Sequence, residues 1–136
     1  MSEFHSLEEA RAFFTQDRFA TENGIVLEEL IPGGSVCSVE LTDRHRNAEG
    51  GVMGGVMMTL IDFAFAAAAS NAHRPTVAQQ SSISFLNGVR GKKLTAKAVC
   101  RKDGRTSCVY NVDVTDELGR DIAQAVMTGF KIPKAP

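Results

Sequence analysis

One ionisable side chain, Asp62, interrupts an apolar run that extends from Val52 to Ala69. Its sequence neighbours are Ile61 and Phe63, and a carboxylate in such surroundings is unfavourable unless it is hydrogen-bonded or its pKa is raised. One interpretation is a buried structural aspartate that backbone donors satisfy. The other is a general base or nucleophile, because partial desolvation is a usual way to tune a catalytic carboxylate. The residue pattern leaves both interpretations open.

Two glycines, Gly54 and Gly55, open the same apolar segment. If a helix begins there, the backbone N–H groups of its first turn have no intrahelical partners and lie at the positive end of the helix dipole. Glycine also allows a ligand to approach the backbone closely. The pair is therefore a candidate oxyanion hole, and its structural alternative is a tight turn with close packing.

The distance between these groups constrains how they could act together. Asp62 lies about eight residues beyond Gly54, which is roughly 12 Å along a helix that rises 1.5 Å per residue. The two groups cannot reach one carbonyl within a single chain. Two such helices related by a two-fold axis would bring Asp62 of one chain near Gly54 of the other. A catalytic role for both groups therefore predicts a homodimer with two shared sites.

Composition and spacing exclude several other classes of function. A formal net charge of −1 does not indicate binding to nucleic acid or to an anionic membrane. A membrane span is rejected because nearly half of the run is Ala, Gly and Thr, and because Asp62 near its centre would cost about 2.5–3.5 kcal/mol. A phosphate loop is rejected because no Lys-Ser/Thr follows the glycines. The histidines and cysteines lack metal-ligand spacing, so we expect no metal.

The chain length predicts one domain over residues 1–136, and the N-terminal residues lack the pattern of a secretion signal, so a cytoplasmic protein is expected. A capping box at Ser6 and Glu9 predicts a helix that ends before Asn23-Gly24. A central helix is expected from about 55 to 71. Strands are expected at 25–30, 35–41, 76–86, 94–100, 108–114 and 122–132. This order predicts an α+β fold in which an antiparallel sheet wraps one long central helix, with an extra N-terminal helix.

The central motif resembles a known family. Asn47-x-x-Gly50-x-x-Met53-Gly54-Gly55, followed by Thr59-Leu60-Ile61-Asp62, is similar to the hotdog-fold acyl-CoA thioesterases of the PaaI (phenylacetate-degradation) type. Their signature reads roughly N-x-x-G-x-x-H-G-G-x-x-x-x-L-x-D. The segments that begin at Ser81, Lys102 and Gln124 also look like the family's later strands. The resemblance covers about residues 20–132.

The resemblance implies a hotdog fold and hydrolysis of a short-chain or aryl acyl-CoA thioester. Coenzyme A would be part of the substrate, and no cofactor is implied. Asp62 matches the carboxylate that activates water or attacks the thioester carbonyl. Gly54 matches the glycine whose N–H polarises that carbonyl, and Asn47 matches the asparagine that positions water or the thioester from the other chain. The implied assembly is a homodimer with shared sites, and pairs of dimers form a homotetramer.

Two departures from the family pattern affect the expected site. Met53 stands where the family has histidine, and methionine cannot donate a strong hydrogen bond or carry charge. The hydroxyl that often comes from the strand after the helix falls at Ala78, so we expect Gln80 or Ser82 to replace it from the same face.

Further substrate contacts are expected from Met53 and Gly55, and from Arg90 and Arg105 at the coenzyme A phosphates. The departures favour one alternative, a non-catalytic hotdog protein that binds an acyl-CoA or another small ligand. Dehydratase or hydratase chemistry is disfavoured because no histidine lies near Asp62 in the sequence.

Overall fold

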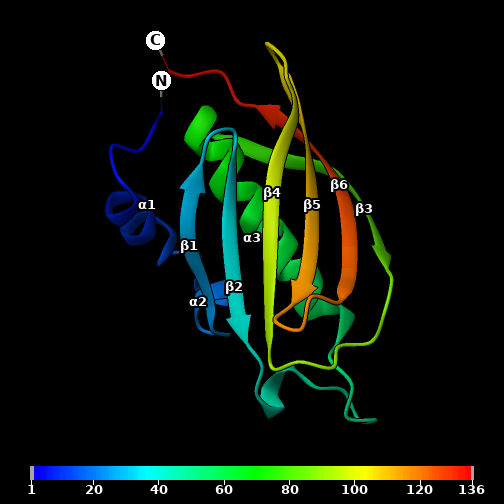
Figure 1. Ribbon diagram of the computed structural model, residues 1–136. Coiled ribbons are helices and arrows are strands. Elements are labelled where there is room, and N and C mark those ends of the chain that lie inside the picture. Colours follow the sequence, from blue (N-terminus) through cyan, green and yellow to red (C-terminus); the bar gives the residue numbers. More distant parts are fainter. Residues whose placement is uncertain (1, 136) are drawn as a thin grey trace.

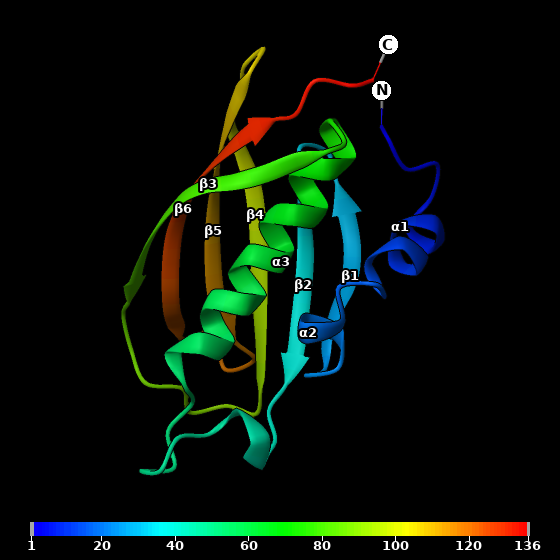
Figure 2. The same ribbon diagram turned by 180° about the vertical axis from the view of Figure 1, so that it is seen from behind.

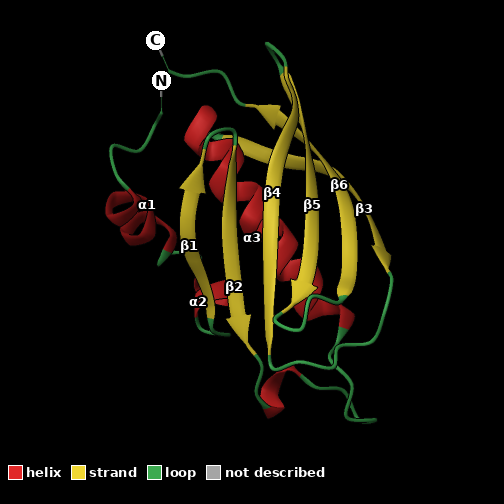
Figure 3. Cartoon of the chain, in the orientation of Figure 1, coloured by secondary structure: helices red, strands yellow, loops and turns green. Residues whose placement is uncertain are grey.

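A six-stranded antiparallel sheet curves around one long helix in the computed structural model, which describes residues 2–135 (Figures 1 and 2). The strand order is β1-β2-β4-β5-β6-β3. The helices are α1 (Leu7–Phe14), α2 (Arg18–Thr21) and α3 (Gly54–Ala72), with a 3-10 turn η1 (Asp43–His45). The strands are β1 (Ile25–Ile31), β2 (Gly34–Glu40), β3 (Thr76–Phe85), β4 (Lys93–Asp103), β5 (Ser107–Asp116) and β6 (Asp121–Lys131). The expected α+β fold is confirmed (Figure 3).

Helix α3 packs closely against the sheet because its buried face carries small residues. Ala64, Ala67 and Ala68 are almost fully buried, and the hydroxyl of Ser35 in β2 donates a 2.6 Å hydrogen bond to the carbonyl of Ala64. By length and composition α3 could cross a membrane, but more than half of its apolar window is buried inside the fold. The helix therefore occupies the place of a core helix.

A glycine in β6 permits a close approach between the sheet and α3. A Cβ at Gly129 would lie 2.7 Å from the ring of Phe65 and 2.8 Å from the sulfur of Cys108. The Phe65 ring in turn packs edge-on against Tyr110 of β5, with their centroids 5.6 Å apart. These contacts fix the rotation of α3, and hence the direction in which its uncovered face points.

The N-terminal segment forms two short helices rather than the single one expected. The hydroxyl of Ser6 accepts the predicted capping hydrogen bond from the Glu9 N–H at 3.1 Å. Helix α1 nevertheless ends at Phe14, and tight-turn hydrogen bonds from the N–H groups of Gln16 and Asp17 close it. Helix α2 then starts with Asp17 as its N-cap residue. This second start places α2 beside the first half of α3 (Figure 2).

The edge strand β3 carries the irregularity that matters most for the site. Its pairing with β6 shifts between Ala78 and Gln80, which is the signature of a β-bulge. Beyond the bulge, Ser81 and Ile83 pair with residues that are buried against α3, while Ser82 pairs with the exposed Val126. A bulge inserts one residue and so inverts the alternation of faces along the strand.

Candidate functional site

The candidate site lies on the face of α3 that the sheet leaves uncovered. Gly55, Met58, Thr59 and Asp62 are exposed or half-buried, and their spacing of three and four residues places them on one side of the helix. The residues between them are mainly buried in the core. The sequence therefore presents glycine, hydroxyl and carboxylate groups along one stripe over two turns.

The start of α3 offers backbone donors. Met53 is the N-cap residue and no side chain caps the helix, so the N–H groups of Gly54 and Gly55 have no helical or side-chain acceptor within residues 2–135. A Cβ at Gly54 would lie 3.2 Å from the ring tip of Phe85, which is exposed at the end of β3. Glycine is therefore suited to this position, and Phe85 is a neighbour of the site that the sequence pattern did not reveal.

Asn47 organises the loop that leads into this helix. Its side-chain oxygen accepts hydrogen bonds from the N–H groups of Glu49 and Gly51, each at 3.0 Å. Because the oxygen is used inside the loop, the amide NH₂ group is the part that remains available to a ligand. Asn47 is thus exposed as a donor, which suits the positioning of a water or a carbonyl oxygen.

The carboxyl group of Asp62 lies two turns further along α3 without a hydrogen bond or ion pair to any residue in the described range 2–135. Burial of the carboxyl group raises its pKa, and the negative charge of Asp17 raises it further. The structural interpretation of an aspartate held by backbone donors is therefore wrong. A carboxylate that is unpartnered, accessible and raised in pKa has the properties of a general base or nucleophile.

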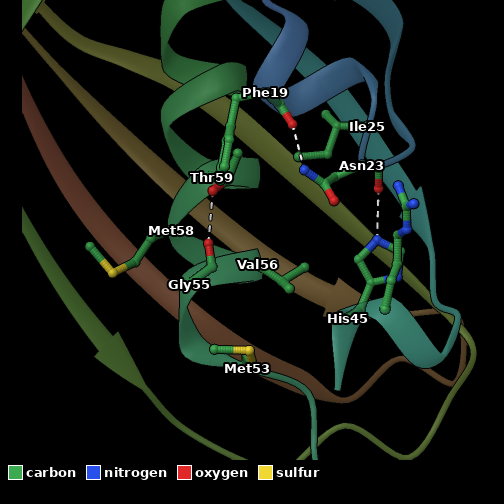
Figure 4. Close-up of a pocket in the computed structure, with 10 residues that line it drawn as sticks. Phe19, Asn23, Ile25, His45, Met53, Gly55, Val56, Met58 and Thr59 are labelled. Carbon is green, nitrogen blue, oxygen red and sulfur yellow. Dashed lines mark hydrogen bonds between the residues drawn. The ribbon is translucent and has the colours of Figure 1, made fainter. Parts of the chain in front are cut away.

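A hollow of about 400 Å³ opens beside the first turns of α3 (Figure 4). Its lining is mostly apolar and includes Phe19, Ile25, Met53, Val56 and Met58. The polar groups in its wall are largely occupied by the protein itself, as the dashed lines in Figure 4 show: the Asn23 amide donates to the Phe19 carbonyl and the Thr59 hydroxyl to that of Gly55. The hollow therefore offers a hydrocarbon surface next to the free N–H groups.

His45 supports this hollow and does not act in it as an acid or base. The residue is 3% exposed. Its Nδ1 accepts from the Thr42 N–H at 2.9 Å, and its Nε2 lies 2.7 Å from the Asn23 carbonyl. These partners fix a neutral ring with the proton on Nε2. The contact with Asn23 joins two segments that lie 22 residues apart in the sequence.

A second hollow, of about 270 Å³, lies between α3 and strand β3, and Asp62 lines it. Gln80 and Ser81 both line it. Ser82 instead lines a hollow on the outer face of the sheet, beside Asn111 and Asp113. The prediction that Gln80 and Ser82 lie on the face of Ala78 is wrong, because the bulge between Ala78 and Gln80 changes the phase of the strand. Ala78 pairs with the buried Gly129, whereas Ser82 pairs with the exposed Val126. Ser81 is the hydroxyl that the structure brings to Asp62.

Comparison with known proteins adds to this geometry. Residues 49–123 match the family model of the thioesterase superfamily. The chain is 30% identical over 115 residues to the acyl-coenzyme A thioesterase PaaI of Escherichia coli (strain K12), and the match spans 84% of this chain and 82% of that protein. The chain belongs to the thioesterase superfamily. The resemblance to its PaaI type is confirmed.

Relatives in this superfamily also share the fold. The structure of the Escherichia coli PaaI protein superposes with a TM-score of 0.87 at 26% identity, covering 94% of each chain. A hypothetical thioesterase from Streptococcus pneumoniae, solved with coenzyme A, superposes with a TM-score of 0.81 at 27% identity, covering 90% of this chain and 99% of that one. Human acyl-coenzyme A thioesterase 13 is 29% identical over 74% of each chain.

Arg90 and Arg105, the two residues expected to contact the coenzyme A phosphates, lie at opposite ends of the sheet. The segment with Arg90 joins β3 to β4 at the end where α3 begins, and the turn with Arg105 projects beyond the other end (Figure 1). Four backbone N–H groups, among them those of Arg90 and Gly91, donate to the carboxylate of Asp116. Although burial raises the pKa of Asp116, these hydrogen bonds outweigh it and lower the pKa. Within one chain the structure brings Arg90, and not Arg105, to the end that carries Gly54.

Within residues 2–135, no three His, Cys, Asp or Glu side chains gather closely enough to hold a metal ion. The donors at the start of α3 are backbone amides.

Proposed function

We propose that this member of the thioesterase superfamily hydrolyses acyl-CoA thioesters, with Asp62 as general base or nucleophile. The Gly54 N–H would stabilise the oxyanion and the Asn47 amide would position the water or the thioester. The observation that carries the proposal is the pairing of free N–H groups at the start of α3 with an unpartnered carboxylate of raised pKa on the same helix face. The Streptococcus pneumoniae relative solved with coenzyme A supports the substrate class.

The site would be completed by a second copy of the chain. Helix α3 is continuous from Gly54 to Asp62, so these groups are separated by roughly 12 Å along its axis. One carbonyl can therefore contact both groups only if they come from two chains. We propose a homodimer in which α3 helices lie side by side, and dimers that pair into a homotetramer as the family resemblance implies.

The free edge of β3 supports this assembly. Arg11 covers part of the other sheet edge, β1, by donating to the carbonyls of Leu27 and Glu28. No side chain within residues 2–135 donates to a β3 carbonyl in this way, and most of the strand is exposed. An uncovered edge strand is a template for pairing with another strand.

The acyl group would occupy the hollow at the start of α3. A thioester carbonyl at the Gly54 N–H would place its acyl carbons beside Met53 and Gly55, which both line that hollow. Since its surface is mostly hydrocarbon and about 400 Å³ in volume, an uncharged short-chain or aryl acyl group fits best. Basic side chains near this end, Arg90 among them, are the candidates for the coenzyme A phosphates.

Release of free thiol from a panel of short-chain, aryl and long-chain acyl-CoA esters tests the proposal. We expect Asp62→Asn to lower kcat by about 10²–10⁴-fold, the usual contribution of a general base. The matched control is Asp113→Asn, the same chemical change at an exposed carboxylate on the outer face, which should keep full activity. Equal hydrolysis by wild type and Asp62→Asn would refute the role of Asp62.

One observation favours a second candidate function. Met53 replaces the histidine of the family signature, so a protein that binds acyl-CoA esters without hydrolysing them is the alternative. Titration calorimetry on the same panel separates the two. Binding without thiol release by the wild-type protein would support the binding function and reject the enzyme.

A further inference from the structure

Asp17 carries a carboxylate that the fold does not use. It is the N-cap residue of α2, yet its side chain makes no capping hydrogen bond. Only its backbone takes part in hydrogen bonds, including one from the Thr21 N–H. Within residues 2–135 the Asp17 carboxylate has neither a hydrogen-bond donor nor an ion-pair partner. A helix cap that is not made leaves the residue without its ordinary structural explanation.

The same carboxylate lines a hollow with Asp62. This hollow, of about 250 Å³, lies between α2 and α3 and is lined by Asp17, Arg18, Phe19, Ala20, Thr59, Asp62 and Phe63. The two aspartates come from separate helices and face the same small space. Within the described residues no backbone or side-chain donor reaches either carboxylate, so the two negative charges share this space without a compensating hydrogen bond.

In the described part of the chain, no other charged group that lines the hollows beside Asp62 offsets the negative charge of Asp17. Arg18, the cation in the hollow, is paired with Glu22, the C-cap residue of α2. On the opposite side of Asp62, strand β3 presents Gln79, Gln80 and Ser81, which carry no charge. The other residues of α3 that line these hollows are Met58, Thr59 and Phe63. Among the described residues that line these two hollows, Asp17 therefore supplies the unpaired charge that faces Asp62.

We propose that Asp17 is a positioning residue for the hydrolysis, which acts through Asp62 by controlling its charge state from across their shared hollow. The proposal rests on the proposed function of Asp62. Two like charges in one partly desolvated space disfavour ionisation of the second carboxyl group. Once ionised, Asp62 is then a stronger base than an isolated aspartate, and proton transfer from water to a stronger base is more favourable.

The direction of the pKa shifts agrees with this geometry. Burial raises the pKa of Asp17, and the charge of Asp17 adds to the effect of burial on the pKa of Asp62. Because the interaction belongs to the pair, removing the charge of Asp17 should ease ionisation of Asp62. Without the Asp17 charge, activity should extend to lower pH, but the ionised Asp62 should be a weaker base.

Two readouts on Asp17→Asn test the proposal. Asparagine is as good an N-cap residue as aspartate, so α2 is retained while the charge is removed. Carbon NMR titration of the carboxyl groups should show Asp62 titrating at lower pH in the variant. The acid limb of kcat/KM should move in the same direction, with relative activity on that limb rising about twofold, the size of a like-charge contact between neighbouring side chains.

Matched variants separate charge from structure. Glu8→Gln removes an equal charge from an exposed position on α1 outside the hollow and should leave both profiles unchanged. Asp17→Glu keeps the charge and should retain the wild-type limb. An Asp62 titration that is identical in wild type and Asp17→Asn would overturn the proposal. The NMR titration needs no substrate, so its outcome stands even if the protein proves not to be a hydrolase.

Discussion

The carboxyl group of Asp62 is held where ionisation is disfavoured. Burial raises its pKa first, and the nearby charge of Asp17 raises it further. For an acid whose pKa is higher in the folded than in the unfolded protein, the stability present at low pH is lost as pH rises through the folded pKa. A charged Asp62 therefore works against folding at neutral pH, which agrees with the proposed catalytic role of this residue.

A stability measurement checks this sign. We expect Asp62→Asn to raise Tm at about pH 7, because the variant no longer places a charge at this position. The gain should shrink as pH falls, and should vanish below about pH 4, where the wild-type carboxyl group is also neutral. Thermal unfolding followed by circular dichroism across this range gives the comparison. A variant that is less stable than wild type at neutral pH would mean that the Asp62 carboxylate has a stabilising partner.

Met53 marks where this chain departs from its family. The side chain is 47% exposed beside the hollow, and its backbone N–H donates to the His45 carbonyl at 3.0 Å. Replacing it with histidine leaves that backbone bond unchanged and adds a side-chain donor near the proposed carbonyl position. We expect Met53→His to raise kcat/KM on the order of tenfold, the effect of one hydrogen bond to a charged group.

The control for this change is Met53→Gln, which tests whether a polar side chain of similar length is sufficient. Steady-state hydrolysis of the best substrate gives the measurement. A loss of activity in Met53→His, with unfolding at the wild-type Tm, would show that the thioether contributes to acyl binding and that the site has diverged in specificity.

At the scale of elements, local signals predicted most of the fold. The Asp103-Gly104 pair, a dipeptide typical of hairpin turns, falls at the β4–β5 turn, and α3 ends at Ala72, shortly before Arg74-Pro75. The apolar run predicted α3 to within a residue at each end, because a helix wrapped by a sheet must be apolar around most of its circumference. Gly54 and Asp62 follow from the same pattern, and the structure leaves both accessible.

Two features that the sequence did not predict are the bulge in β3 and the break between α1 and α2. The stretch Gln79-Gln80-Ser81-Ser82 is polar on both faces, so nothing in it fixes which residues point inward. A bulge sets the phase, and it needs the β6 partner to be recognised. The break after Phe14 depends on packing of its ring against Phe63, with centroids 5.7 Å apart. The sequence alone could not link Asp17 to Asp62, because the two residues are brought together by the packing of the N-terminal segment against α3.

At the scale of the molecule, one chain holds two incomplete halves of the proposed site. Within residues 2–135, no carboxylate lines the hollow beside the donors at the start of α3, and neither Gly54 nor Gly55 lines the hollows that contain Asp62. The β3 edge could pair with a second chain and so bring it close to both halves. β3 ends at Phe85, which lies beside Gly54, and its residues line a hollow together with Asp62. Assembly and activity should therefore be lost together.

Lysines on the β3 edge test this link. Ser82 and Ser84 are exposed on the outer face of β3, and lysine there disfavours strand pairing because like charges meet across the two-fold axis. We expect Ser82→Lys/Ser84→Lys to sediment as a monomer and to lose at least about 10²-fold in kcat/KM, since neither catalytic half acts alone. Asn111→Lys on the central strand β5 is the matched control and should remain dimeric and active. A wild-type monomer with full activity would contradict the shared site, because roughly 12 Å of continuous helix separates Gly54 from Asp62 within one chain.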